Sequence, residues 1–145
     1  AMVSTVSIEF PEVSFQFCEA VDAMRRSMGL EFAPPCELEM SLRQTGASTH
    51  VLEVMSRVAT FGPQPWLALK TVAGTYHYDN FDIDVPFHRW QYVFDEETFP
   101  LNALSDIGVA ANNAFGITTV AVLDVASTKI ARVILNKPDA DGDVP

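Results

Sequence analysis

The sequence predicts an α+β fold, in which an antiparallel β-meander sheet of four or more strands packs with two or more helices, mainly on one face. Three strand patterns follow one another at residues 36–43, 50–61 and 66–78, joined by short polar or proline-containing links. Consecutive strands on short links favour antiparallel neighbours. Helical spacing of apolar residues appears twice, within residues 17–28 and 98–116.

The first strand is the most regular, because its apolar and polar residues alternate. The apolar set is Cys36, Leu38, Met40 and Leu42. Such alternation is typical of a half-buried strand with one face in water. The third strand, from Trp66 to Tyr78, is apolar on both sides. We therefore expect it to lie in the centre of the sheet, or to have its second face covered by another chain.

Two segments favour helices. In the first, Phe17, Val21, Met24 and Met28 share one helical face, and Gly29 is a suitable end. In the second, Pro100 suits a first helical turn and Gly116 suits an end. The apolar stripe of this second helix would be Leu104, Ile107, Ala111 and Phe115. The following residues, 117–135, favour a hairpin, with a continuing helix as the alternative.

Length and composition limit the classes of partner. The 145 residues are 48% hydrophobic, so we expect one α+β domain over residues 1–136 and an acidic, disordered tail over 137–145. The formal net charge is −10. This argues against nucleic acid, whose binding requires cationic side chains, and against anionic membrane surfaces.

The segment after Met2 lacks the basic and apolar regions of a signal peptide, and no apolar stretch is long enough to span a membrane. A cytoplasmic location is therefore expected. The two cysteines, Cys18 and Cys36, make neither a disulfide framework nor a zinc site, so free thiols are expected.

One cluster of imidazoles and carboxylates stands out. It comprises His77, Asp79, Asp82, Asp84 and His88. Histidine next to carboxylate suits acid–base chemistry, so a ligand pocket near Tyr76, His77, Asp79 and His88 is one hypothesis. The alternative is a polar loop that follows a strand. No glycine-rich phosphate loop or metal motif is present, and we predict no cofactor and no metal site.

Aromatic residues are concentrated in the same region. Six of them are predicted to contact a partner: Trp66, Tyr76, Tyr78, Phe87, Trp90 and Tyr92. Rings with polar tips contribute contact area at low entropic cost, which suits binding surfaces. The alternative is that most of these rings fill the core.

The strand layout resembles that of the SecB export-chaperone family. The resemblance begins at Pro35-Cys-Glu-Leu-Glu-Met-Ser-Leu42 and continues through 51–58 and 66–76 to Phe99-Pro100, with Leu104 and Ile107 after it. It implies an antiparallel sheet followed by a helix, and chaperone-like binding of polypeptides. Leu101-Asn-Ala103 stands where that family usually has tyrosine and an Arg-Glu pair. The resemblance transfers no site residue.

Two functions follow from these observations. The first is a non-enzymatic, chaperone-like or assembly subunit that forms homo-oligomers and holds a hydrophobic or basic polypeptide on an aromatic-rich surface. The second is a small-molecule enzyme or carrier that uses the histidine-containing pocket.

Overall fold

The computed structural model describes residues 5, 8–12, 20–29 and 34–135. The chain divides into two units, Ala1–Phe32 and Ala33–Pro145. In the first unit, helix α2 spans Ala20–Ser27. This confirms a helix within the segment that apolar spacing indicated.

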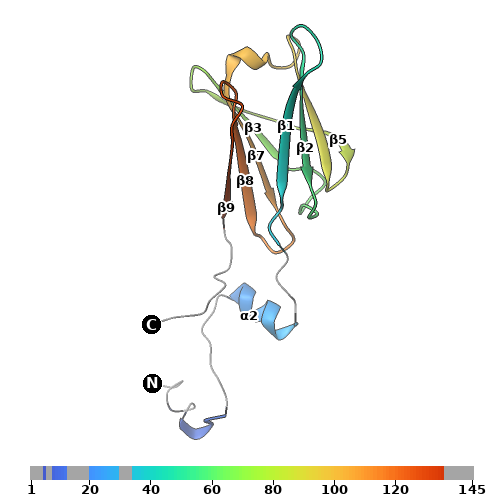
Figure 1. Cartoon of the computed structure of the whole chain (residues 1–145). Helices are drawn as coiled ribbons and strands as arrows, with labels where there is room; N and C mark the ends of the chain where they lie inside the picture. Colours follow the sequence, from blue (N-terminus) through green and yellow to red (C-terminus); the bar gives the residue numbers. More distant parts are fainter. Residues whose placement is uncertain (1–4, 6–7, 13–19, 30–33, 136–145) are drawn as a thin grey trace. The chain divides into compact units, whose positions relative to one another are not determined.

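The second unit contains nine strands. They are β1 (Leu38–Gln44), β2 (His50–Ser56), β3 (Trp66–Thr71), β4 (Tyr76–Asp79), β5 (Asp82–Val85), β6 (Arg89–Phe94), β7 (Leu104–Asn112), β8 (Thr118–Asp124) and β9 (Ile130–Leu135). A four-stranded sheet has the order β1-β2-β6-β5, and a five-stranded sheet has the order β4-β3-β7-β8-β9. All pairings are antiparallel, and Figure 1 shows the two sheets as separate layers.

Successive hairpins of the chain belong alternately to the two sheets. The hairpins β1–β2 and β5–β6 belong to the four-stranded sheet, whereas β3–β4 and the β7–β8–β9 meander belong to the five-stranded sheet. Each sheet is completed by a pairing between strands distant in sequence, β2 with β6 and β3 with β7. Neither sheet is therefore built from neighbouring hairpins alone.

The inner faces of the sheets make one core. Its largest fully buried side chains are Trp90, Phe94, Leu38, Leu52, Leu67, Leu69, Ile107 and Leu123, contributed by both sheets. Two hydrogen bonds satisfy polar groups at its margin. The Trp90 indole donates to the Pro63 carbonyl at 2.8 Å, and the Tyr92 hydroxyl donates to Asp79 Oδ2 at 2.7 Å. The second bond links one sheet to the other.

The predicted α+β class is wrong, because the described residues form mostly β structure with one short α-helix and one 3-10 turn. The helix expected over residues 98–116 is a 3-10 turn, η1 (Leu101–Ala103), followed by β7. A β-bulge explains the error. Lys70 pairs with Asp106 but Thr71 pairs with Leu104, so Ser105 is an extra residue. Leu104 and Ile107 consequently both face the core at a spacing that imitates a helix.

The predicted meander is correct only for its first two strands. β1 and β2 are neighbours, but β3 crosses to the other sheet. The expected third strand is a hairpin, since the chain turns between β3 and β4 at Gly74, whose φ is +83°. β3 does lie between two strands, as expected. The hairpin predicted for residues 117–135 is confirmed, because β8 and β9 pair antiparallel.

Residues 137–145, predicted to be a disordered tail, lie outside the described residues. No helix in the described part of the chain is long and apolar enough to cross a membrane.

Replacement of Asn113 by alanine should lower the free energy of unfolding by about 2–4 kcal/mol. Asn113 is 2% exposed, its Oδ1 accepts from the amides of Phe115 and Ile117, and its Nδ2 donates to the Pro34 carbonyl. Urea denaturation measures the loss. Asn112→Ala is the matched control, because Asn112 is exposed. Equal losses for the two variants would contradict this role.

The protein should lose stability in acid as two turn carboxylates become protonated. Backbone and side-chain hydrogen bonds from Thr98 lower the pKa of Asp95, and those from Ser127 lower the pKa of Asp124, from an ordinary value of 3.8. Their contribution is complete above pH 3.8 and disappears as the pH falls through the lowered pKa values. The Asp95→Asn/Asp124→Asn variant should show a shallower acid slope in urea denaturation. An unchanged slope would contradict the prediction.

Candidate functional site

The six aromatic residues predicted to bind a partner occupy three different environments. Trp66, Tyr76 and Tyr78 are 78%, 60% and 80% exposed and belong to β3 and β4. Phe87 is 44% exposed in the turn between β5 and β6. Trp90 and Tyr92 are 0% and 6% exposed and belong to the core. The structure thus gathers three of the six on one sheet.

These three residues share the outer face of the five-stranded sheet. Residues that oppose each other in an antiparallel pair lie on the same face, so the registers define which side chains share it. We call the following set the apolar face: Trp66, Ala68, Tyr78, Gly108, Ala110, Val120, Val122, Ala131 and Val133. It crosses all five strands without a charged residue.

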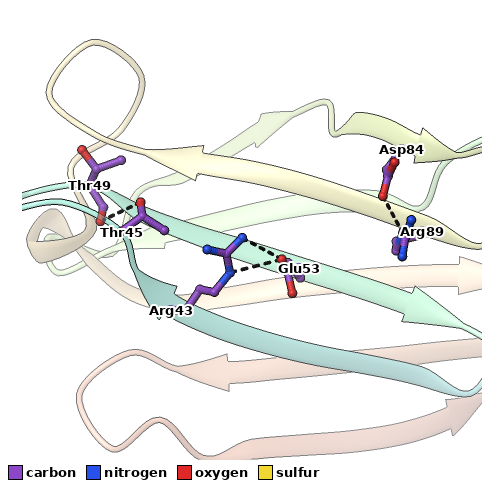
Figure 2. Close-up of polar contacts among 6 residues, drawn as sticks. All are labelled: Arg43, Thr45, Thr49, Glu53, Asp84 and Arg89. Atoms are coloured by element: carbon purple, nitrogen blue, oxygen red, sulfur yellow. Dashed lines mark hydrogen bonds and ion pairs between the residues drawn. The ribbon is translucent and has the colours of Figure 1, made fainter.

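The outer face of the four-stranded sheet has the opposite character. Arg43 pairs with Glu53 at 2.8 Å, Arg89 pairs with Asp84, and these side chains stand on neighbouring strands in Figure 2. Arg57 and Glu39 form a further ion pair at 3.6 Å. Exposed ion pairs add little stability, but they are the normal covering of a sheet face in water. The five-stranded sheet has one such pair, Lys70 with Asp106, at the end of its outer face.

The centre of the apolar face is low and flat. Gly108 lies opposite Ala68 on one side and Val122 on the other. A Cβ atom added at Gly108 would meet the Ala68 carbonyl oxygen at 3.7 Å, which is an ordinary contact. The fold therefore accepts alanine at this position. Trp66 and Tyr78 are the large exposed residues that lie beside these small ones.

One end of the apolar face is charged. Lys70 Nζ lies 3.3 Å from Asp106 Oδ2, and Asp124 stands directly opposite Asp106 on β8. Asp106 raises the pKa of Lys70, and hydrogen bonds from Ser127 lower the pKa of Asp124, so these groups are charged at neutral pH. Lys129 also acts electrostatically on Asp124, so two carboxylates and two ammonium groups meet at this end.

The structure separates the residues of the alternative pocket. Tyr76 faces outward with Tyr78, whereas His77 and Asp79 lie on the opposite side of β4. The His77 ring packs on Phe99 at a centroid distance of 4.9 Å, and Asp79 accepts the Tyr92 hydroxyl. His88 belongs to the other sheet's turn, where its Nδ1 lies 3.0 Å from the Ser56 carbonyl oxygen.

His88 lines a shallow, open depression of about 300 Å³ on the four-stranded sheet. Its other lining residues are Glu39, Met55, Ser56, Arg57, Val85 and Arg89. Tyr76, His77 and Asp79 do not line it. Within the described residues, no three histidine, cysteine, aspartate or glutamate side chains meet as a metal site.

Sequence reasoning did not identify Gly108, Ala110, Val120, Val122 and Val133 as surface residues. The first two fell in the expected helix, and the others in an apolar segment whose faces were not assigned. The alternation of Ile107, Val109 and Ala111 with smaller residues was the available signal for a strand. The bulge at Ser105 obscured it.

No protein-family model, no curated protein and no solved structure matches this chain. The resemblance to the SecB family therefore stays a prediction, and the helix that it implied after Phe99-Pro100 is replaced by β7.

The fluorescence of the two tryptophans should distinguish the core, where Trp90 lies, from the outer face of the five-stranded sheet, where Trp66 lies. In Trp66→Phe the remaining Trp90 is buried, so its fluorescence should be shifted to the blue and weakly quenched by acrylamide. In Trp90→Phe the remaining Trp66 should be quenched strongly. Similar quenching constants in the two folded variants would contradict the placement of these rings.

Proposed function

We propose that this chain is a non-enzymatic polypeptide-binding subunit, chaperone-like or part of an assembly, that holds an apolar, basic segment of its partner on the apolar face. The observation that carries the proposal is the difference between the two outer faces. The outer face of one sheet carries three ion pairs, whereas the other has a row of uncharged residues on all five strands and one ion pair, Lys70–Asp106, at its end.

The area of the apolar face supports binding. Aromatic side chains contribute roughly 150–250 Å² each when buried. Trp66 and Tyr78 are 78% and 80% exposed, and Val122 and Val133 add 36% and 54% of their own surfaces. Contiguous apolar patches of this kind mark interaction sites on proteins that otherwise carry polar surfaces.

Charge favours a basic partner. The chain has a formal net charge of −10, and Asp106 and Asp124 stand at one end of the apolar face, each beside a lysine. A lysine or arginine that follows an apolar stretch of the partner would contact Asp124 while its apolar neighbours cover Val122 and Gly108. Complementary charge of this kind contributes to specificity and to the association rate.

A direct test compares two short synthetic peptides, one of alternating valine and lysine and one of alternating valine and glutamate. The valine–lysine peptide should bind and the valine–glutamate peptide should not. The Trp66→Ala/Tyr78→Ala variant should weaken binding roughly tenfold or more, because exposed aromatic anchors dominate such interfaces. Isothermal titration calorimetry measures the affinities.

Phe61→Ala is the matched control, since Phe61 is 74% exposed but lies outside the apolar face. It should leave binding unchanged. The Trp66 and Tyr78 replacements remove exposed rings, so thermal unfolding should change little. Equal binding of the two peptides, or an equal effect of Phe61→Ala, would refute the proposal.

A further inference from the structure

The edge strand β9 differs from the other three sheet edges. The edges are β1, β5, β4 and β9. β1 carries the charges of Glu39 and Arg43, β5 carries Asp82 and Asp84 with an irregular register, and β4 has only four residues. Charged side chains, an irregular register and short length usually prevent an exposed edge strand from pairing with another chain. β9 has six residues and no acid, and its apolar side chains are 36–54% exposed at Ile130, Val133, Ile134 and Leu135.

The single charged side chain of β9 is directed toward the other sheet. Arg132 Nε donates to the Leu38 carbonyl oxygen across the sandwich at 2.7 Å. A further strand added to β9 would leave this hydrogen bond in place.

Backbone hydrogen bonds identify the groups that β9 presents outward. Asp124 N donates to Lys129 O, whereas Val125 N donates to Ser105 O on β7. Bonded and non-bonded pairs alternate along an antiparallel ladder. Residues 129, 131, 133 and 135 therefore bond to β8, and the amides and carbonyls of Ile130, Arg132 and Ile134 point away from the sheet.

We propose that a second copy of this chain pairs its β9 with this edge, antiparallel and about a two-fold axis at Val133. In this register Arg132 exchanges hydrogen bonds with Ile134 of the other copy, and the two Val133 side chains meet. The register centred on Arg132 would instead place two like charges directly opposite, which is unfavourable.

Electrostatics also favours a second copy at this place. Two chains of net charge −10 repel each other, and the repulsion is weakest for a contact between surfaces that carry no acid. β9 presents none. The pairing would join the two apolar faces at Val133 into one surface, since Val120 and Ala110 continue the same row. This inference does not depend on the proposed function, because it concerns the chain without a partner polypeptide.

Light scattering coupled to size-exclusion chromatography, over a range of concentrations, tests the pairing. The chain should be a dimer, and Val133→Lys should raise the dimer dissociation constant roughly tenfold or more. Val133→Glu should do the same, and an equimolar mixture of the two variants should recover the dimer. Val72→Lys is the control, because Val72 is 71% exposed and lies outside β9.

A cross-link tests the register. In a Cys18→Ser background, Val133→Cys should form a disulfide between copies under mild oxidation, because facing residues of a non-bonded pair lie about 4.5 Å apart at Cα. Val122→Cys, on the neighbouring strand, should not. A monomer at every concentration would overturn the proposal, as would a dimer that survives Val133→Lys and gives no Val133→Cys cross-link. If a charged variant fails to fold, as judged by circular dichroism, the presence or absence of the Val133→Cys disulfide tests the proposed pairing.

Discussion

The packing of the two inner sheet faces against each other is the constraint on which the rest of this structure depends. Side chains alternate along each strand, so the residues that enter the shared core determine which residues face outward. Trp90 and Phe94 of one sheet meet Leu67, Leu69 and Ile107 of the other in one buried cluster. The composition of each outer face is therefore a separate property of the sequence, and the core does not account for it.

The two outer faces differ in a way that stability alone does not require. Arg43, Glu53, Asp84 and Arg89 cover one sheet with charge, as expected of a surface in water. The other sheet has valine, alanine and glycine at the equivalent outward positions. The fold would accept alanine at Gly108, and the proposed binding function would account for the small residues of this surface. The edge strand β9 contributes Ala131 and Val133 to this apolar face.

Sequence patterns predicted the strands well where alternation was regular, as in β1 and β2. They failed where backbone irregularity changed the spacing, since the bulge at Ser105 places Leu104 and Ile107 on one face. They also failed to divide the aromatic residues, because Trp66 has apolar neighbours in the sequence and is exposed, whereas Trp90 has polar neighbours and is buried. That division depends on which sheet each strand joins, and the pairings of β2 with β6 and β3 with β7 are not local in sequence.

In the proposed function, apolar contact would hold a partner and the net charge of −10 would favour a basic one. Methyl-group NMR tests this account most directly, by comparing the two outer faces during titration with the valine–lysine peptide. The account predicts that the resonances of Val120, Val122 and Val133 shift, whereas those of Val93 and Met55 on the four-stranded sheet do not. Shifts confined to Val93 and Met55, or no shifts at all, would contradict it.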